Sequence, residues 1–580
     1  VSSILIFKSK IIHETDTEIL EQLFKRSKVE HPSATINKQD LQRAKENIEK
    51  HPWAKTVQRR IKSAADKTIT MYSEDSFLEN MISRTSPVSQ TFCPHCASNG
   101  NDFIPTGHWS WTIDDPDHIK CLAYGTIYPK EAYPETLQYR SQWDPEQVIT
   151  YVNNGPKKCF DYYRCYSSVN GLIRNYKLDY TIKRLTTYSQ AFALYNDIKY
   201  AEATKRILLK LADRFPKYLV YCGHSISQYA DCDPHYAVQH IPNLPVIDGK
   251  KCPIIVADPE YQPDTFFDDY GQTGRAGTTG SDGEYVEIMA LAYDLVADAK
   301  RDEDGTPLFS EEEKKHVEED LLIESCLFGF FDKKINNKST LNVKGCAIVG
   351  LVVGNAILVR FGLDGFNRCF DEYFLKDGST SQSVTYGLKT LMGFGGFNLA
   401  FRNYSDPSYY TPGPDEIQYK NFNINRDTEY ESLWHSLVWS PYYDTTYPII
   451  GNQTHGRDFP SEYYEFLTNE YKHKYIQEFI GSLQNKEKIP QNNAIFMRDI
   501  DYVPFNGSFV LSDMIYPYLM QGFIRSGEFG EESLLFLDAS LADGGHNHYD
   551  SMNIIYTKYG KELLLDLGYL LDHPNRSKTM

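Results

Sequence analysis

The sequence lacks several features that would assign it to a familiar class of protein. No apolar run among its 580 residues approaches the roughly 20 residues that a membrane-spanning helix needs. Basic charge is not in excess either, because 78 acidic residues outnumber 60 basic ones and leave a formal net charge of −18. A chain without a global basic field has little to attract phosphates. We therefore predict neither a membrane span nor a nucleic-acid partner.

Several catalytic signatures are also missing from the sequence. GxGxxG, Walker-type and Ser-His-Asp patterns are absent, so nucleotide-dependent enzymes and serine hydrolases find no support. The 11 cysteines are odd in number and scattered, which excludes a small disulfide framework. Tyrosine, in contrast, is abundant at 43 residues, and its apolar face with a hydroxyl suits sugar rings as well as ordinary packing.

The size of the chain predicts more than one domain. At 66.8 kDa it exceeds the size at which a single hydrophobic core keeps growing. The first residue is Val, and VSSILIF is too short to be a whole signal peptide. We therefore expect a processed or trimmed chain.

Helical periodicity dominates the middle of the sequence. Two apolar stripes at helical spacing are separated by NDIKY (196–200) and predict a helical hairpin over 181–219. The stripes consist of Leu185, Tyr188, Phe192 and Tyr195, and of Ile207, Leu208, Leu211 and Phe215. Further helices are predicted over 281–299 and 343–362. Repeated amphipathic hairpins over more than 200 residues favour a toroid or solenoid of helix pairs.

The pattern changes at about residue 494. The runs AIFMRDI, SFVLSDMIY, SLLFLDASL, MNIIYTKY and KELLLDLGY are rich in β-branched and aromatic residues and predict antiparallel strands. We divide the chain into an N-terminal helical segment with a Cys-containing, knuckle-like loop (1–150), a helical domain (151–490) and the start of a β domain (491–580). The last of these is expected to be incomplete.

The stretch GGHNHYDS places two imidazoles and a carboxylate at alternate positions. His546, His548 and Asp550 could share one face of an extended strand. A turn at 559–561 would pair the two following runs and bring Asp566 roughly opposite Ile555, at the same end of the hairpin as the histidines. Such a group is a reasonable start to a zinc or manganese site, and a surface turn with unrelated histidines is the alternative.

The segment HNHYDSMNIIYTKYGKELLLDLGY (546–569) resembles the heparinase II/III family of polysaccharide lyases. That family's pattern is His-x-His-x-Asp, an apolar run ending in Tyr-x-Gly, and an Asp-x-Gly-Tyr return. The predicted helices are similar to the same family's toroid. The resemblance implies an incomplete (α/α) toroid of helical hairpins followed by an antiparallel β-sandwich, truncated here, with the active site between them. It also implies an acidic polysaccharide substrate and a secreted or periplasmic location.

The resemblance assigns roles to residues of this motif. His546 matches the family's catalytic histidine, while His548 and Asp566 match two ligands of its structural metal, zinc or manganese. The only later histidine, His573, lies in what looks like the loop before the third ligand. We therefore expect that ligand beyond Met580.

Two more catalytic residues follow from the resemblance. Tyr386 stands where the family has a tyrosine that opens a helix after a DG motif, and it would share proton transfer with His546. Asn342 would neutralise the carboxylate of a uronate, which makes the C5 proton removable. From the residues alone, Tyr386 could equally be a packed helix-start tyrosine and Asn342 a helix N-cap. Asn336 and Asn337 are fallback candidates for the carboxylate role.

The sequence departs from the family's pattern near both of these residues. Gln382 or a neighbour stands where many members carry Glu, and Val343 stands where a histidine often follows the asparagine. Gln382, together with Tyr124 and the missing third metal ligand, leaves open a scaffold that has lost its activity.

Three cysteines invite a second zinc site. Cys93-x-x-Cys96 is one pair, but Cys121 is followed by Tyr124 where a zinc ribbon has its fourth cysteine. His95, His108 or His118 are alternative fourth ligands. The other interpretation is a relic of a knuckle without a metal.

Two aromatic and basic segments are candidate substrate-binding loops. HSLVWSPYYD contributes His435 and Trp439, and NQTHGRDF contributes His455 and Arg457. Arginine can grip a carboxylate or sulfate with two hydrogen bonds, and tryptophan can stack on a pyranose. A solvated loop with core aromatics is the alternative.

We predict a polysaccharide lyase that cleaves a uronate-containing chain, foremost a glycosaminoglycan, by β-elimination. A uronyl C5-epimerase would abstract the same proton, and a glycan-binding protein with a defunct site would keep the same body. A toroidal glycoside hydrolase needs paired carboxylates, for which Asp282, Glu284 and Glu287 are candidates.

Overall fold

The computed structural model describes most of the chain between residues 16 and 566. The residues outside the description are 1–15, 100–103, 105, 156, 159–163, 223–227, 245, 248–249, 252–253, 257–269, 271–272, 278, 302–304, 381, 383, 415, 443–444, 451–458, 470–472, 508–510, 528–530, 541–551, 560 and 567–580.

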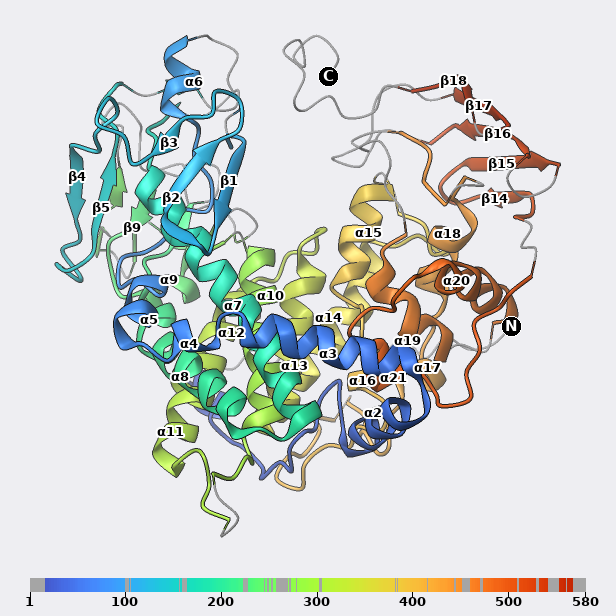
Figure 1. The fold of residues 1–580 in the computed structure, drawn as a ribbon, viewed down its shortest axis with the longest axis horizontal. Helices are drawn as coiled ribbons and strands as arrows, with labels where there is room; N and C mark the ends of the chain where they lie inside the picture. Colours follow the sequence, from blue (N-terminus) through green and yellow to red (C-terminus); the bar gives the residue numbers. More distant parts are fainter. Residues whose placement is uncertain are drawn as a thin grey trace.

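The structure is a mixed α+β fold that is mostly helical (Figure 1). Two β-rich regions stand above the helical body, one from residues 109–274 at the left of the view and one from residues 514–564 at the right. None of the helices in the described part of the chain combines the length and the apolarity that crossing a membrane requires.

The N-terminal segment contains more β structure than the sequence predicts. Its helices are α1 (Asp16–Leu23), α2 (Lys38–Lys50), α3 (Pro52–Asp66), α4 (Ile69–Tyr72), α5 (Asp75–Met81) and α6 (Pro94–Asn99). As predicted, Pro52 opens a helix, where its missing N–H costs nothing. The strands that follow were missed because each is only two to seven residues long: β1 (Trp109–Thr112), β2 (Asp115–Cys121), β3 (Ile127–Tyr128), β4 (Leu137–Arg140), β5 (Val148–Tyr151), β6 (Lys157–Lys158) and β7 (Arg164–Cys165).

A second group of short strands lies between the helices that follow. These strands are β8 (Tyr221–Cys222), β9 (Gln228–Ala230), β10 (Val246–Ile247), β11 (Lys250–Lys251), β12 (Ile254–Val256) and β13 (Thr273–Gly274). Four of them form a sheet in the order β12-β9-β8-β13.

The helical hairpin predicted over 181–219 is confirmed. It consists of α7 (Val169–Tyr195) and α8 (Ile198–Arg214). The connector is shorter than predicted, because Asn196 adopts a left-handed conformation at φ 51° and Asp197 caps α8 by accepting a hydrogen bond from the Lys199 amide. Leu185 and Tyr188 of the predicted stripe are fully buried.

The single helix predicted over 343–362 is in fact two. α13 (Ser339–Val353) ends at Gly354, whose φ of 72° favours glycine, and Asn355 caps α14 (Ala356–Glu372) by accepting a hydrogen bond from the Leu358 amide. Both helices bury most of their surface, so the apolar run continues through the break, and the break cannot be recognised in the sequence pattern. The result is another helical hairpin. α10 (Thr279–Val296) packs between α7 and α13, so the helices neighbour one another in the order α8, α7, α10, α13, α14.

The remaining helices complete the body beneath the C-terminal sheet. They are α9 (Pro234–Gln239), α11 (Glu311–Lys315), a π-helical turn (His316–Ile323), α12 (Glu324–Phe331), α15 (Val384–Met392), α16 (Phe397–Ala400), α17 (Ile424–Asp427), α18 (Ser432–Trp439), α19 (Tyr464–Asn469), α20 (Lys474–Lys486) and α21 (Ala494–Met497). Helix α21 corrects the sequence prediction, in which AIFMRDI is a strand. Its residues Ile495 and Phe496 are buried in the main core with α2 and α3, so packing against helices decides their conformation.

The C-terminal region forms one antiparallel sheet of five strands in chain order. The strands are β14 (Met514–Tyr516), β15 (Gln521–Ser526), β16 (Ser533–Asp538), β17 (Asn553–Lys558) and β18 (Lys561–Leu564). The predicted turn between MNIIYTKY and KELLLDLGY is confirmed by the pairing of Lys558 with Lys561. β15 was missed. Within the described residues this region holds a single sheet, so the sandwich stays a prediction.

A buried ion pair connects the N-terminal helices to α19. The Arg498 guanidinium bonds to both carboxylate oxygens of Glu465, stacks on the Trp53 ring at 5.1 Å and lies 3.8 Å from Glu487. Both members of the pair are almost completely buried. Burial and the neighbouring Glu465 raise the pKa of Glu487 to about 7.

This raised pKa predicts a pH-dependent stability. The folded chain binds the Glu487 proton more tightly than the unfolded chain, so this contribution is full below the ordinary pKa and is lost as pH rises through about 7. We expect Glu487→Gln to match the parent at pH 4 and to be more stable by on the order of 1–2 kcal/mol at pH 8, measured by urea unfolding. Glu478→Gln on α20 is the control, and a difference independent of pH would contradict the assignment.

Candidate functional site

Asn342 lies inside α13 rather than at its N-cap. The helix begins at Ser339 after Lys338, so the capping alternative is wrong for Asn342. Two glycines of neighbouring helices face it: a Cβ on Gly283 of α10 would lie 2.7 Å from Asn342 Oδ1, and a Cβ on Gly329 of α12 would lie 2.9 Å from Asn342 Cβ. The three helices therefore approach most closely where the asparagine stands.

The side-chain nitrogen of Asn342 is buried and has no hydrogen-bond partner among the described residues. Burying an amide without a hydrogen-bond partner costs about 1–3 kcal/mol of folding free energy, so packing alone does not explain why an asparagine stands here. Asn342 lines a pocket together with Phe330, Phe361 and charged residues of both signs, which are Lys333, Lys334, Arg368, Asp332 and Asp364. The site thus places the buried amide beside an apolar surface and charged groups of both signs.

The helix that carries Tyr386 is held against the helix that carries Asn342. The Thr340 hydroxyl donates to the Thr390 carbonyl at 2.6 Å, and the Thr390 hydroxyl donates to the Tyr386 carbonyl at 2.8 Å. Tyr386 lies one turn before Thr390 on α15, and Asn342 lies two residues after Thr340 on α13. The first bond joins the first turn of α13 to the last turn of α15, and the second lies within α15 and connects Thr390 to the turn that carries Tyr386.

Tyr386 lies in the first turn of α15, as predicted, and is half-buried. The Lys389 ammonium group lies 4.8 Å from the centre of its ring, a position from which a positive charge stabilises a phenolate. Nearby, the Tyr373 hydroxyl donates to Gln382 Oε1 at 2.8 Å. Gln382 therefore accepts a hydrogen bond as the family's Glu could, but it brings no negative charge.

Two of the three carboxylates of α10 have structural partners. Asp282 accepts hydrogen bonds from the backbone amides of Arg275, Ala276 and Gly277 at 2.6 to 3.2 Å, and burial raises its pKa to about 6. Both of its oxygens thus hold the loop that precedes the helix. Glu287 is engaged in an ion pair with Lys344.

The buried ion pair of Lys344 and Glu287 next to Asn342 was not predicted from the sequence. Lys344 Nζ lies 2.7 Å from Glu287 Oε1, and both side chains are largely buried. Burial also raises the pKa of Glu284 on the same helix. The signal was present in the sequence, because a lysine within the otherwise apolar run VKGCAIVGL is rarely buried without a partner.

His435 and Trp439 lie on α18 in an aromatic cluster. The Trp439 ring stacks on Tyr475 at 4.4 Å, and the His435 ring lies 5.0 Å from Trp439 and 5.3 Å from His473. Burial lowers the pKa of His435 to about 4, so the ring is neutral in the physiological range. The other two predicted binding residues, His455 and Arg457, lie outside the described residues. A role in substrate binding stays a prediction for all four.

The predicted metal ligands are described only in part. His546, His548 and Asp550 lie outside the described residues. Asp566 follows β18 and accepts a hydrogen bond from Asn553 Nδ2 at 2.6 Å, near the strand end where it was predicted but beside Asn553 rather than Ile555. One carboxylate does not define a metal site, and we derive no chemical step through this metal.

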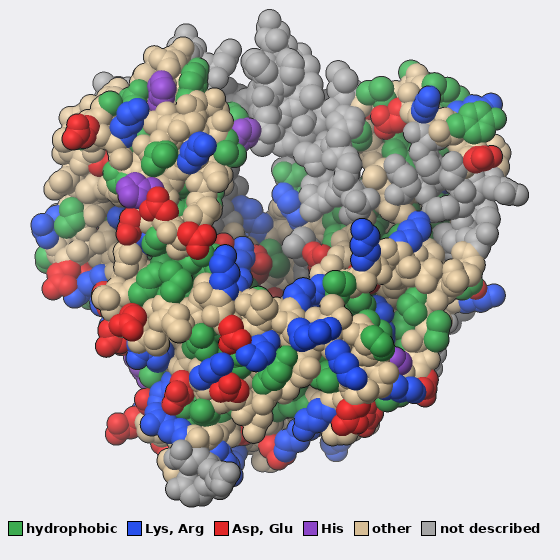
Figure 2. Space-filling model, in the orientation of Figure 1, with side chains coloured by type: hydrophobic (Ala, Val, Ile, Leu, Met, Phe, Trp, Pro, Cys, Tyr) green, Lys and Arg blue, Asp and Glu red, His purple; other side chains and the backbone are tan. Residues whose placement is uncertain are grey.

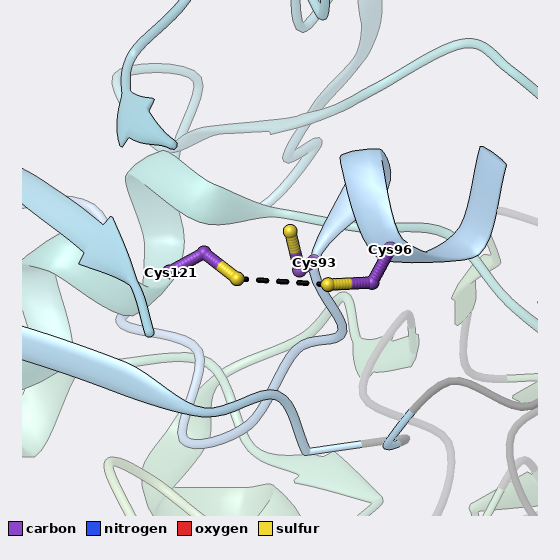
Figure 3. Close-up of side chains that lie close together, drawn as sticks. All are labelled: Cys93, Cys96 and Cys121. Atoms are coloured by element: carbon purple, nitrogen blue, oxygen red, sulfur yellow. Dashed lines mark hydrogen bonds between the residues drawn. The ribbon is translucent and has the colours of Figure 1, made fainter. Parts of the chain in front are cut away.

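Three cysteines of the N-terminal region converge and could hold a metal ion. The sulfur atoms of Cys93, Cys96 and Cys121 all lie within 4.8 Å of one another, and two of the three side chains are buried (Figure 3). Among the described residues, no histidine completes the group. The predicted substitution of His95, His108 or His118 for the fourth cysteine therefore finds no support.

The surface is hollowed between the two β-rich regions. Figure 2 shows this depression in the upper middle of the molecule, with Lys and Arg side chains and several carboxylates around its floor.

The close approach at Asn342 gives a steric test of the site. We expect Gly283→Ala to lower kcat/KM by about 10²-fold, because the new methyl group forces the asparagine or its helix to shift by several tenths of an ångström. Gly280→Ala, one turn earlier on α10, meets only movable side-chain carbons at 3.2 Å and is the matched control. Equal activities of the two variants, measured on a substrate of the parent, would show that Asn342 does not act where it lies.

Comparisons with known proteins show similarity only at the level of structure. No protein-family model matches the sequence. No curated protein matches it either. Solved structures do match, all at low sequence identity.

A mutant of the heparan sulfate lyase HepC from Pedobacter heparinus matches with a TM-score of 0.37 and 12% identity, over 71% of this chain and 54% of that one. A heparinase III structure has a TM-score of 0.32 and 10% identity over 67% and 49% of the two chains. An alginate lyase from Bacteroides ovatus has a TM-score of 0.37 and 14% identity over 82% and 97%. The solved structures that match thus include a heparan sulfate lyase and an alginate lyase, and the chain spans about half the length of the heparan sulfate lyase.

Proposed function

We propose that the protein is a polysaccharide lyase that cleaves a uronate-containing polysaccharide, foremost a glycosaminoglycan, by β-elimination. The observation that carries the proposal is the buried, unpaired amide of Asn342 on a helix that is bonded to the helix of Tyr386. An amide donor without a protein partner is suited to a ligand acceptor, and a uronate carboxylate is such an acceptor.

The chemistry assigns a task to each residue. A hydrogen bond from Asn342 to the uronate carboxylate would disperse the charge that develops when the C5 proton leaves. Tyr386 would take or return a proton, helped by the nearby Lys389 ammonium group. The electron pair from the C5–H bond forms the C4–C5 double bond as the C4–O bond breaks, and a proton passes to the leaving oxygen. His546 enters as the second proton-transfer group on the strength of the sequence resemblance.

The substrate class follows from the chemistry. β-Elimination needs a carboxylate at C5, which glycosaminoglycans and alginate both present. Three cations, Lys333, Lys334 and Arg368, line the Asn342 pocket against two carboxylates, so the pocket is locally less acidic than the whole chain and would repel an acidic polymer less. Polymers of this kind are met outside the cytoplasm, so a secreted or periplasmic location belongs to the proposal.

The proposal is tested on a panel of heparan sulfate, chondroitin sulfate, hyaluronan and alginate. Cleavage by elimination leaves an unsaturated uronate whose ultraviolet absorbance rises with time, and at least one polymer should give this signal. Unchanged absorbance with inverted uronate stereochemistry would identify an epimerase instead. Binding of a polymer without either change would identify a glycan-binding protein and overturn the lyase assignment.

A further inference from the structure

The cysteine cluster has the geometry of a metal knuckle rather than of ordinary packing. Cys93 and Cys96 flank the start of α6, and Cys121 ends β2, so two separate segments bring their sulfurs to one point (Figure 3). The sulfur atoms of Cys96 and Cys121 are 3.5 Å apart. Four thiolates around zinc at about 2.3 Å lie about 3.8 Å from one another, whereas a disulfide requires about 2.05 Å.

Backbone amides point at the same sulfur atoms. The amides of Ala123 and Tyr124 donate to the Cys121 sulfur, and the amide of Cys96 donates to the Cys93 sulfur. Buried cysteines that serve only as small apolar side chains need no such donors.

We propose that Cys93, Cys96 and Cys121 bind one zinc ion as three thiolate ligands and leave its fourth position to an exchangeable ligand such as water. Tyr124 stands where the second knuckle would supply the fourth thiolate, and it is exposed. Thiolate ligands select zinc or other thiophilic metals over magnesium and calcium. Neither the lyase activity nor the predicted metal at Asp566 enters this inference.

The position of the cluster indicates a structural role. Cys93 and Cys121 belong to a small core with Tyr128 of β3 and Leu172 of α7, so a bound ion would connect α6 to the three-stranded sheet where both pack on α7. This sheet forms part of the left wall of the depression seen in Figure 2. Small sheets of two to seven residues per strand gain most from such a cross-link.

The experiment measures the metal content of the purified full chain by elemental analysis. We expect Cys96→Ser to lose one equivalent of zinc per chain, while Cys232→Ser, a cysteine outside the cluster, loses none. Asp566→Ala is included so that loss from a second metal site is not confused with loss from the cysteines. Cobalt substituted for zinc should give the intense near-ultraviolet absorbance of cobalt–thiolate bonds in the parent and not in Cys96→Ser.

A gain-of-function variant keeps the test decisive if the cysteine variants fail to fold. Tyr124→Cys supplies a fourth thiolate at the knuckle position and should slow the transfer of zinc to a chelator at least tenfold. Equal zinc content in Cys96→Ser and the parent, or an unchanged transfer rate in Tyr124→Cys, would overturn the proposal. Reactive thiols can also be counted in denaturant after chelation of the metal. A count two below the number of cysteines, because Cys96 and Cys121 are oxidised to a disulfide, would likewise overturn the proposal.

Discussion

Tyr386→Phe is expected to lower kcat by about 10²–10⁴-fold while leaving KM within a few-fold, because it removes a proton-transfer group and little else. The phenol is half-buried in the first turn of α15, and its ring contacts are kept by phenylalanine. The measurement is the initial rate of absorbance on the polymer that the parent cleaves best. Thermal unfolding of the variant should match the parent within a few degrees.

The matched control is Tyr373→Phe. Tyr373 lies close to Tyr386, and its hydroxyl is hydrogen-bonded to Gln382 and to the Thr390 side chain, so its loss removes these bonds without removing the proposed proton carrier. We expect its kcat within a few-fold of the parent. A Tyr386→Phe variant as active as Tyr373→Phe would remove the tyrosine from the mechanism.

Asn342→Ala is expected to lower kcat/KM by about 10²–10³-fold, the usual loss when one donor to a developing oxyanion is removed. Its effect on folding should be small for a buried polar residue, since the amide nitrogen has no partner to lose in the part of the chain that the structure describes. Activity and unfolding temperature measured on the same preparation therefore separate a catalytic from a structural role. A drop in stability of several kcal/mol together with the lost activity would favour a structural role.

Asn336→Ala serves as the control for the asparagine assignment. Asn336 was the fallback candidate, and its side-chain oxygen accepts a hydrogen bond from the Lys338 amide in the turn before α13. We expect this variant to retain most of the activity. The reverse result, with Asn336→Ala inactive and Asn342→Ala active, would move the carboxylate role to the turn.

Local pattern predicted the elements that have a clear amphipathic period. The α7/α8 hairpin and the turn between β17 and β18 could be placed because their apolar residues or turn residues repeat at the expected spacing. The break at Gly354 could not be predicted, because α13 and α14 are both buried on most of their surface and give one continuous apolar run. α21 was mistaken for a strand because burial, not propensity, decides a four-residue segment.

In the candidate site, too, the sequence predicted some features, while others depend on tertiary packing. A resemblance over residues 546–569 pointed to Asn342 and Tyr386, and the structure places them on helices that are bonded through Thr340 and Thr390. The contacts of Gly283 and Gly329 with Asn342 depend on the packing of three helices and leave no periodic signal. The convergence of Cys121 with Cys93 and Cys96 is likewise a matter of tertiary structure, because 25 residues separate Cys96 from Cys121.

We propose that the chain breaks a C4–O bond of its substrate by elimination, without adding water. The most direct measurement is the mass of the products formed in water enriched in the heavy oxygen isotope. Elimination predicts unsaturated products that carry no heavy oxygen when they are reduced at once, before the new reducing end exchanges its oxygen with water, and these form with the parent and not with Tyr386→Phe. Saturated products, each cleavage having incorporated one heavy oxygen atom, would show hydrolysis and contradict the account.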